Sequence, residues 1–435
     1  MVLLILAGVS INLVIGNNGI VTKAGDARDK TEQAKANEEA DLLGLQDELE
    51  IALGEKEEPP AKVAVGNKAT SNSTIDGKYA SATNPIIPEG YIPIDTGTTS
   101  WGDGSSAPTE ENVNKGLVIK DESGNEWVWV PVDNTTLAGM YETASTPIEL
   151  TGGGAITDET VLNPLKQIKI SKYSKSITIT NNNSTTKTIS RVRPNDTSSY
   201  REPDVVVYSD GTSYDARDTN RATAGFKKAD GTTMTLAEMA DTMRSEYETM
   251  IASIEKYHGF YIGRYELTAN GEKTGATLTR KTWYYLYNQC KGLSASNKVM
   301  SRMIWGNQWD VTCNWIANYG DKKNISDSST WGNYYGTSVK ASDGTTEIKK
   351  SDKQQILDTG ITTFTRANNI YDFAGNCEEW TQEAVITSDR ASRGGFCSSS
   401  GSIIPASSRD FSTPTSDDIS VERFSSHFNS ATLSN

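Results

Sequence analysis

The sequence is short of the residues on which most metal and catalytic sites depend. Its 435 residues include only two histidines, His258 and His427, and four cysteines, none of which forms a CxxC pair. Because zinc sites take Cys and His ligands at short, regular spacings, a zinc site of the usual kind is excluded. We expect most of the thiols to be free or buried. The cysteines are Cys290, Cys313, Cys377 and Cys397.

An excess of positive charge is also absent. The chain has 42 Lys and Arg against 56 Asp and Glu, a net charge of −14, and no basic face is evident in the sequence. Proteins that bind nucleic acid use such a face, so we expect no nucleic-acid partner. Proline is scarce, while Ser, Thr, Asn and Gly abound, which fits a loop-rich, surface-exposed protein. The length predicts one large domain with appendages.

The N-terminal residues are unusually apolar. Residues 1–16 form an almost unbroken apolar run, which is shorter than the ~20 residues that span a bilayer and lacks the charged start of a secretory signal. Residues 17–56 continue with helical periodicity and many charges. Together they resemble the N-terminal helix of type IV pilin-like proteins, although the leader of that family and its early glutamate are missing. We expect residues 1–56 to form a long helix that attaches the protein to a membrane or a pilus-like assembly. An ordinary buried helix is the alternative.

The composition and periodicity of the sequence change twice after residue 56. Residues 57–115 are polar, contain Pro and Gly, and keep no sustained period, which predicts a linker or stalk. From Gly116 the sequence reads GLVIKDESGNEWVWVPVDN, which predicts a β-hairpin with its turn at residues 123–125. We therefore expect the folded domain to comprise residues 116–435. A second hairpin is predicted within residues 167–192, with its turn at 181–184.

Three further elements are predicted inside the domain. Thr235 and Glu238 form a capping box that begins a helix ending at His258. The following GFYIGRYELT predicts a strand buried on both faces, and residues 279–290 predict another helix. In the next block, VMSRMIWGNQWDVTCNWI, the tryptophans are expected in the core and Asp310 as a buried hydrogen-bond acceptor. His258 is expected to interact with the helix dipole rather than to act as a base.

The stretch from Asn368 to Gly395 is the most distinctive in the chain. It reads NNIYDFAGNCEEWTQEAVITSDRASRGG, with chain reversals predicted at Gly375-Asn376 and Gly394-Gly395. This pattern resembles the NxYDxxGNxxEWT…RGG signature of the formylglycine-generating enzyme (sulfatase-modifying factor) family. The segments WVPV and FYIGRYELT resemble strands of the same family. The resemblance implies an α+β, C-type-lectin-like fold with much irregular structure.

The same resemblance implies a structural calcium site. Four oxygen-bearing side chains match positions that hold calcium in the family, and such ligands suit a hard cation. The alternative is that these side chains cap turns and satisfy backbone amides. The four candidates are Asn369, Asp372, Asn376 and Glu379.

The segment after Gly395 is rich in serine and has almost no hydrophobic pattern, so a low-complexity linker is one interpretation. It also resembles the variable region of diversity-generating retroelement target proteins, which use the same fold and place a framework such as "GS..PAS.R" after RGG. The resemblance implies a diversified ligand-binding face over residues 396–418. The candidate positions are Phe396, Cys397, Ser398, Ser399, Ser400, Ile403, Ile404, Ser408, Asp410, Phe411, Ser412, Asp417 and Asp418. The family's closing Gly-Phe-Arg strand is missing, so the last ~15 residues are expected to be frayed.

An enzymatic role is the main alternative. Aerobic formylglycine-generating enzymes use two cysteines after RGG to bind copper as thiolates, whereas this chain has only Cys397 there and Cys377 lies upstream. We therefore expect no catalysis and no copper.

The sequence predicts a surface-displayed protein, attached through its N-terminal helix, that binds an unidentified protein or glycan. The alternatives are an enzyme of the formylglycine-generating type and a minor structural pilin-like subunit.

Overall fold

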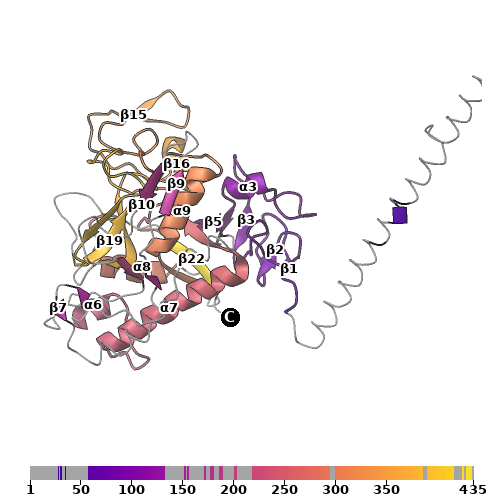
Figure 1. Cartoon of the computed structure of the whole chain (residues 1–435), viewed down its shortest axis with the longest axis horizontal. Coiled ribbons are helices and arrows are strands. Elements are labelled where there is room, and N and C mark those ends of the chain that lie inside the picture. The colour runs from indigo at the N-terminus through magenta and orange to yellow at the C-terminus, as the bar shows by residue number, and fades with distance from the viewer. Residues whose placement is uncertain are drawn as a thin grey trace, which may run out of the picture. The chain divides into compact units, whose positions relative to one another are not determined.

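The computed structural model describes residues 57–132, 218–293, 299–385 and 389–415, several short strands outside these ranges, and the helical positions Arg28, Lys30, Thr31 and Lys35. The chain divides into two compact units, Met1–Pro59 and Pro60–Asn435. The predicted N-terminal helix lies outside the described residues, apart from the four positions just named. The larger unit is a mixed α/β structure with small, mostly antiparallel sheets (Figure 1).

The larger unit is built on a six-stranded antiparallel sheet. In spatial order its strands are β13 (Val299–Met303), β22 (Phe428–Leu433), β12 (Gly259–Gly263), β5 (Glu126–Pro131), β4 (Val118–Lys120) and β3 (Ile92–Ile94). The β4–β5 pair is the predicted hairpin, with Gly124 in the turn at positive φ. The buried strand predicted after His258 is β12, which pairs with β5 along its whole length.

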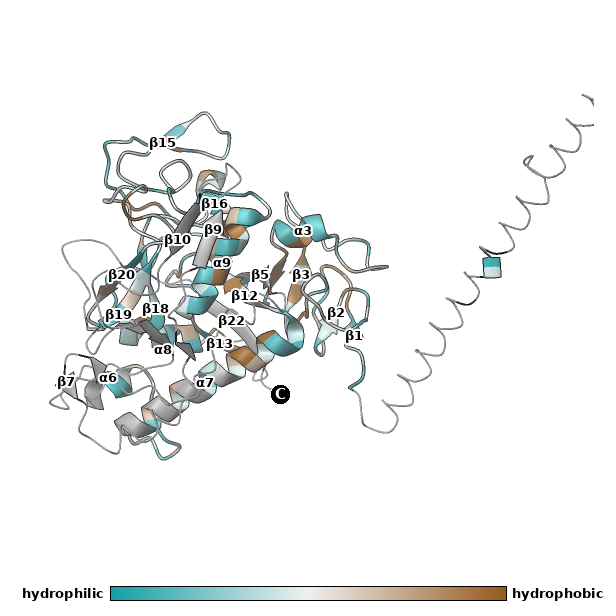
Figure 2. Cartoon of the chain, in the orientation of Figure 1, coloured by the Kyte–Doolittle hydropathy of each residue, from teal (hydrophilic) through white to brown (hydrophobic). Residues whose placement is uncertain are grey.

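Both faces of this sheet are covered, because β12 and residues 127–131 of β5 have no polar side chain except the hydroxyl of Tyr261. Val128 and Val130 of β5 point into one hydrophobic core, while Trp127 and Trp129, which alternate with them, point into a second core. In Figure 2, β3 and β5 are coloured hydrophobic, whereas α3 (Glu110–Asn114) is largely hydrophilic.

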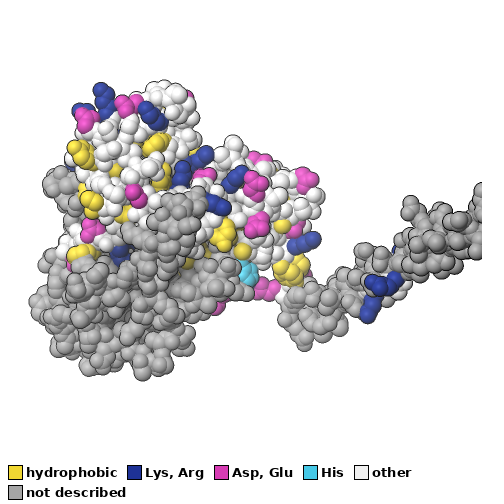
Figure 3. Space-filling model, turned by 45° about the horizontal axis from the view of Figure 1, so that its top comes forward, with side chains coloured by type: hydrophobic (Ala, Val, Ile, Leu, Met, Phe, Trp, Pro, Cys, Tyr) yellow, Lys and Arg dark blue, Asp and Glu magenta, His cyan; other side chains and the backbone are white. Residues whose placement is uncertain are grey.

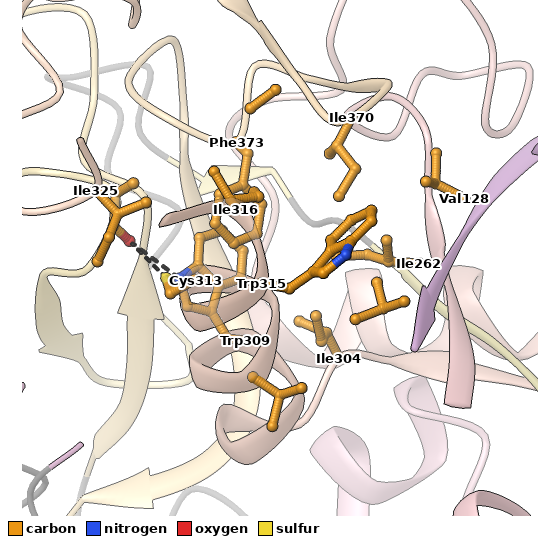
Figure 4. Packing of buried hydrophobic residues seen from close by; sticks show 14 of the residues in the cluster. Val128, Ile262, Ile304, Trp309, Cys313, Trp315, Ile316, Ile325, Ile370 and Phe373 are labelled. Carbon is orange, nitrogen blue, oxygen red and sulfur yellow. Dashed lines mark hydrogen bonds between the residues drawn. The ribbon is translucent and has the colours of Figure 1, made fainter. Parts of the chain in front are cut away.

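Two helices cover the first face. They are α7 (Leu236–Tyr257), which begins with the predicted Thr235–Glu238 capping box, and α9 (Gly306–Asn318). Figure 4 shows Trp309 and Trp315 of α9 among Phe373, Ile370 and Ile304, and the rings of Trp309 and Phe373 stack with centroids 4.0 Å apart. The helix predicted at 279–290 is α8 (Trp283–Lys291).

The second face is covered by residues that the sequence predicted to be a linker. Residues 60–115 contribute buried apolar side chains to the second core, including Ile87, Tyr91 and Trp101. They are also fixed by hydrogen bonds, since the indole N–H of Trp129 donates to the Ala82 carbonyl at 3.0 Å. The prediction of a stalk over 57–115 is therefore corrected. A sheet with tryptophans on its second face needs a cover, and this polar segment supplies it with a few well-spaced apolar residues.

A second sheet carries the distinctive stretch. Its strands are β20 (Arg409–Ser412), β19 (Asp389–Arg393), β18 (Glu378–Val385), β11 (Tyr200–Glu202) and β8 (Ser171–Lys172), and β21 (Phe424–Ser425) pairs in parallel with β18.

The remaining described strands form two-stranded sheets. The pairs are β1 (Ala61–Lys62) with β2 (Ser73–Thr74), β6 (Thr151–Gly152) with β7 (Gly154–Ala155), β9 (Ile177–Thr180) with β10 (Thr186–Ile189), β14 (Val339–Lys340) with β15 (Glu347–Lys349), and β16 (Arg366–Ala367) with β17 (Ile370–Tyr371). The β9–β10 pair is the second predicted hairpin. The other described helices are α6 (Asp218–Thr223) and the short 3₁₀ helix η1 (Thr363–Thr365).

Fraying was predicted for the last ~15 residues, but those that the structure describes, Phe424–Ser425 and Phe428–Leu433, form strands β21 and β22. Strand β22 lies between β12 and β13 and pairs antiparallel with both. Its backbone therefore satisfies hydrogen bonds inside the first sheet, although the Gly-Phe-Arg sequence expected there is missing. In the described part of the chain, no helix has both the length and the apolar character needed to cross a membrane.

Candidate functional site

The candidate surface is carried by the loop between β19 and β20. These two strands are antiparallel neighbours, with Arg393 opposite Arg409 and Ser392 opposite Asp410. Residues 394–408 leave the sheet at Arg393 and return to it at Arg409. The loop therefore begins and ends at the same place in the fold.

A buried carboxylate binds both ends of the loop. Asp310 of α9 accepts a hydrogen bond from Arg393 Nη2 at 2.7 Å and from Arg409 Nη2 at 3.0 Å, and Arg409 Nε also donates to Glu383 Oε2 at 3.0 Å. These four side chains are at most 4% exposed. Charge-assisted bonds of this kind are strong and directional. This confirms the prediction that Asp310 is a buried acceptor, and we call the four residues the arginine clamp.

The backbone of the loop is held by the preceding segment of the chain. Ser328 N–H donates to the Gly401 carbonyl at 2.9 Å, and Tyr335 N–H donates to the Ser399 carbonyl at 3.0 Å. Near the end of the loop, the Trp309 indole N–H donates to the Ala406 carbonyl at 3.0 Å. Because these bonds use backbone carbonyls of the loop, they do not depend on which side chains the loop carries.

Two glycines begin the loop, as the sequence predicted, and both have positive φ, 89° at Gly394 and 75° at Gly395. They differ in the space around them. A Cβ on Gly395 would lie 2.2 Å from the Ile404 carbonyl oxygen, whereas a Cβ on Gly394 would meet nothing closer than 3.5 Å. Gly395 is therefore required by both conformation and space, and Gly394 by conformation alone.

The predicted face is divided between buried and exposed side chains. Ile403 is 77% exposed and Phe411 is 36% exposed. The other partly exposed candidates are Ser398, Ser399, Ser400, Ile404, Ser408, Asp410 and Ser412. Asp417 and Asp418 lie outside the described residues.

Phe396 and Cys397 correct the expectation that every candidate position faces solvent, because they are only 5% and 6% exposed. The Cys397 N–H donates to the Asn376 carbonyl at 3.0 Å, so this part of the chain lies against residues 376–377 instead of facing outward. Among the described candidate positions, fewer side chains are exposed to solvent than the sequence predicted.

The two asparagines among the calcium candidates use their side chains to hydrogen-bond distant segments of the chain. The side-chain oxygen of Asn369 accepts from Thr98 Oγ1 at 3.0 Å, and its amide donates to the Gly116 carbonyl at 2.8 Å. The side-chain oxygen of Asn376 accepts from Asn333 Nδ2 at 2.8 Å and from the Leu357 N–H at 2.9 Å. Both asparagines also have positive φ. These contacts fit the turn-supporting alternative.

The remaining calcium candidates, Asp372 and Glu379, surround a carboxyl group that the sequence analysis missed. Glu266 is fully buried, and burial together with the charges of Asp372 and Glu379 raises its pKa well above the usual range. It accepts hydrogen bonds from the Asn376 amide and from the Cys377 N–H at 3.1 Å. The available signal was a glutamate three residues after the end of the buried strand β12. In the described ranges, no three His, Cys, Asp or Glu side chains are grouped so that they could hold a metal ion.

The structure brings together two cysteines that the sequence places apart. The hydrogen bond between Cys397 N–H and the Asn376 carbonyl sets Cys397 beside Cys377. All four cysteines are free and buried, as predicted. Burial is the main cause that raises the pKa of Cys377, and the charge of Cys397 adds to it. The Cys377 thiol therefore resists ionisation and is a poor nucleophile and metal ligand.

Comparisons with known proteins give little to add to this geometry. No protein-family model matches the sequence, and no curated protein matches it. Among solved structures, the chain is similar to Treponema denticola variable protein 1, with 13% sequence identity and a TM-score of 0.28, over 40% of this chain and 84% of that chain. A likeness at this level does not show a family.

Proposed function

We propose that this chain is a non-catalytic ligand-binding protein whose variable face is the loop between β19 and β20 together with β20 itself. In this proposal residues 116–435 have the C-type-lectin-like fold of the sulfatase-modifying-factor family, extended by the cover of residues 60–115. The protein is a target of a diversity-generating retroelement. The ligand is a protein or glycan, and nucleic acid is not expected as a partner.

The observation that carries the proposal is that the contacts that fix the loop backbone are made by residues other than its exposed side chains. The arginine clamp and the bonds with residues 325–335 fix the backbone, while the side chains of Ser402, Ile403 and Phe411 are exposed. A binding surface can change its side chains only if its backbone does not depend on them. An exposed Ile and Phe also suit a contact patch, since apolar and aromatic side chains provide most interface anchors.

Charge on the surface is consistent with this proposal. Among the coloured, described side chains on the face shown in Figure 3, Lys and Arg lie interspersed with Asp and Glu. Steering of a nucleic acid would need a continuous basic patch.

Two experiments test the proposal. The first is to sequence the DNA around the gene. A near-identical copy of the 3′ end that differs at adenines, beside a reverse transcriptase gene, supports diversification, and its absence contradicts it. The second is to screen the protein against arrays of surface proteins and glycans. A hit should be lost when Ile403 and Phe411 are both replaced by serine, whereas a hit that survives this change would place binding elsewhere.

Display at a cell surface through the N-terminal helix belongs to the same proposal. It is motivated by the apolar run of residues 1–16 followed by a charged helical pattern. Fractionation of cells that express the full chain, compared with a chain beginning at Pro60, tests it. Equal recovery of both chains in the soluble fraction would contradict attachment through the N-terminus.

Structural calcium is a further part of the proposal, with Asp372 and Glu379 as the acidic ligands. Both are buried, and both lie close enough to Glu266 for their charges to raise its pKa. A divalent cation would offset this repulsion. The melting temperature at neutral pH should then rise with added Ca²⁺ but not with Mg²⁺, and Asp372→Asn should abolish the rise. No change with Ca²⁺ would leave these side chains with the turn-supporting role only.

The enzymatic alternative is kept because Cys377 and Cys397 lie beside each other, which the sequence did not indicate. A copper-dependent oxidase would bind Cu(I) through both sulfurs. Conversion of a cysteine-containing sulfatase peptide by the copper-loaded protein, abolished by Cys397→Ser, would establish that function. The minor pilin-like subunit has no observation in its favour among the described residues.

A further inference from the structure

A small cavity lies between α3, α9 and the end of β5, and it involves none of the residues of the variable face. Its volume is about 210 Å³. Pockets for drug-sized ligands measure about 300–1,000 Å³, so this cavity suits a single small ring.

The cavity has an aromatic wall. Tyr319, the residue that ends α9, is 44% exposed and lines it, as does Trp315 one turn earlier, whose side chain is almost fully buried. The flat face of an aromatic ring packs well against the apolar C–H face of a saturated ring. The partly exposed Tyr319 is open to such a contact, whereas Trp315 is already fixed by the core.

Uncommitted polar groups face this wall from α3. The side chains of Glu110 and Asn114 line the cavity and form no hydrogen bond or ion pair with the residues that the structure describes. Asn314 of α9 also lines it, and its side-chain oxygen accepts a bond from Asn318, which leaves its amide N–H₂ available. An amide offers two donors and an acceptor, and a carboxylate offers only acceptors. Together they match a ligand with several neighbouring hydroxyl groups.

The charge of the cavity narrows the ligand class. Among the described residues that line it there is no Lys, Arg or His, and Glu110 is its only charged side chain. Phosphate and carboxylate ligands need a cationic or N–H-rich site, so an anionic ligand does not fit. A purely apolar ligand does not fit either, because it would remove Asn114 from water without offering hydrogen bonds.

We propose that this cavity binds a single neutral pyranose ring of a glycan, with the C–H face of the sugar against Tyr319 and its hydroxyl groups bonded to Asn114, Asn314 and Glu110. The site is separate from the variable face and does not rest on the proposed function. The protein would then bind the same sugar in this cavity regardless of the ligand that its variable loop recognises.

The test is saturation-transfer difference NMR and calorimetry on the full-length protein with methyl α-D-glucopyranoside, methyl α-D-galactopyranoside, methyl α-D-mannopyranoside and N-acetylglucosamine. At least one of these sugars should bind and receive saturation through its ring C–H protons. Tyr319→Ala should weaken its binding about five- to tenfold, the value of one aromatic contact. Asn114→Ala should weaken it by a similar factor, the value of one hydrogen bond. Tyr285→Ala, which removes a comparably exposed tyrosine on α8, should leave it unchanged.

Three outcomes would overturn the proposal. The first is the absence of binding by all four sugars, and the second is an unchanged Kd in Tyr319→Ala. The third is displacement of the sugar by tetramethylammonium with tighter binding, because an aromatic ring beside a carboxylate can also hold an organic cation. Melting temperatures of the variants show whether they fold. If Tyr319→Ala is unstable, Tyr319→Leu keeps the packing and removes the ring, and the same loss of affinity is expected.

Discussion

Arg393 and Arg409 lie directly opposite each other on neighbouring strands, and their guanidinium groups share the carboxylate of Asp310. Two like charges this close would repel each other if the carboxylate were missing. The end of β19 and the start of β20 are thus held together by the Asp310 carboxylate, which fixes both ends of the loop to α9. This arrangement makes Asp310 the most sensitive residue of the candidate site.

Asp310→Asn should destabilise the larger unit by about 3–5 kcal/mol, because it leaves the buried guanidinium of Arg393 without its counter-ion and leaves Arg409 with Glu383 alone. Asp410→Asn is the matched control. Asp410 is partly exposed and forms no ion pair with a described residue, so its replacement should cost less than ~0.5 kcal/mol. Denaturant titration measures both. Equal stability of the two variants would show that the clamp does not hold the loop.

A combined replacement of Ile403, Ile404, Asp410 and Phe411 should change the melting temperature little, because these side chains are exposed or partly exposed. Phe396→Ala should instead cost about 3 kcal/mol or more, since Phe396 is 5% exposed and its loss leaves a cavity. Thermal denaturation of the two variants distinguishes them. Unfolding by the four-residue replacement would mean that the exposed side chains support the loop. This result would contradict the proposal that residues of this loop can vary without loss of the fold.

Gly394→Ala and Gly395→Ala should differ in cost. Each places a Cβ at positive φ, which costs about 1 kcal/mol. Only the Gly395 substitution adds a collision, with a Cβ 2.2 Å from the Ile404 carbonyl oxygen. Hydrogen exchange of residues 396–408 should increase in Gly395→Ala and stay near the wild-type value in Gly394→Ala. The reverse order would contradict the loop geometry.

The stability of the unit should fall as pH rises above the pKa of unfolded glutamate, about 4.3. Burial raises the pKa of Glu272 well above that value, with the charges of Glu379 and Glu266 adding to the effect. The folded state therefore binds the Glu272 proton more tightly than the unfolded state. Above the unfolded pKa, folding must either take up a proton from solution or bury an ionised carboxylate, and both lower the free energy of unfolding. In unfolding measurements from pH 4.5 to 8, Glu272→Gln should lose less stability than wild type. Glu122→Gln, at an exposed position, should follow wild type, and identical slopes in all three proteins would show that Glu272 is ionised without cost.

Cys397→Ser should leave folding and ligand binding unchanged and should remove no copper affinity. Burial raises the pKa of the neighbouring Cys377, so its thiol resists ionisation and does not supply the second thiolate of a copper site. Competition with a chromogenic Cu(I) chelator measures the affinity of wild type and variant. Tight binding by wild type that Cys397→Ser abolishes would reverse the non-enzyme proposal.

Local patterns in the sequence predicted local structure well. The Thr235–Glu238 pair predicted the start of α7, Ser123–Asn125 predicted a hairpin turn, and Asp310 inside a tryptophan-rich block predicted a buried acceptor. Each of these signals depends on residues close together in the chain.

Contacts between distant segments were not predictable in this way. Residues 60–115 look like a stalk because their few apolar side chains keep no period, and only the tryptophans of β5 reveal that a cover is needed. Phe396 and Cys397 looked exposed among serines, but both are buried, and the Cys397 N–H bonds to the carbonyl of the distant Asn376. Glu266 and the neighbouring Cys377 and Cys397 come together through the same tertiary contacts.

The position of the clamp also has a consequence at the level of codons. Arg409 lies within the stretch that would be rewritten, whereas its partner Asp310 is encoded 99 residues upstream and would never change. If rewriting acts at adenines, the codon for Arg409 must avoid an adenine at its first position, which leaves the four CGN codons and forbids AGA and AGG. The adenine of CGA is allowed, because every change at that third position still encodes arginine. Gly401, where an added Cβ would lie 2.6 Å from the Ser329 nitrogen, is protected by the genetic code itself, because all four glycine codons begin with GG and can carry an adenine only at the silent third position. A CGN codon at position 409 would thus keep the arginine clamp intact while adenine-containing codons around it change.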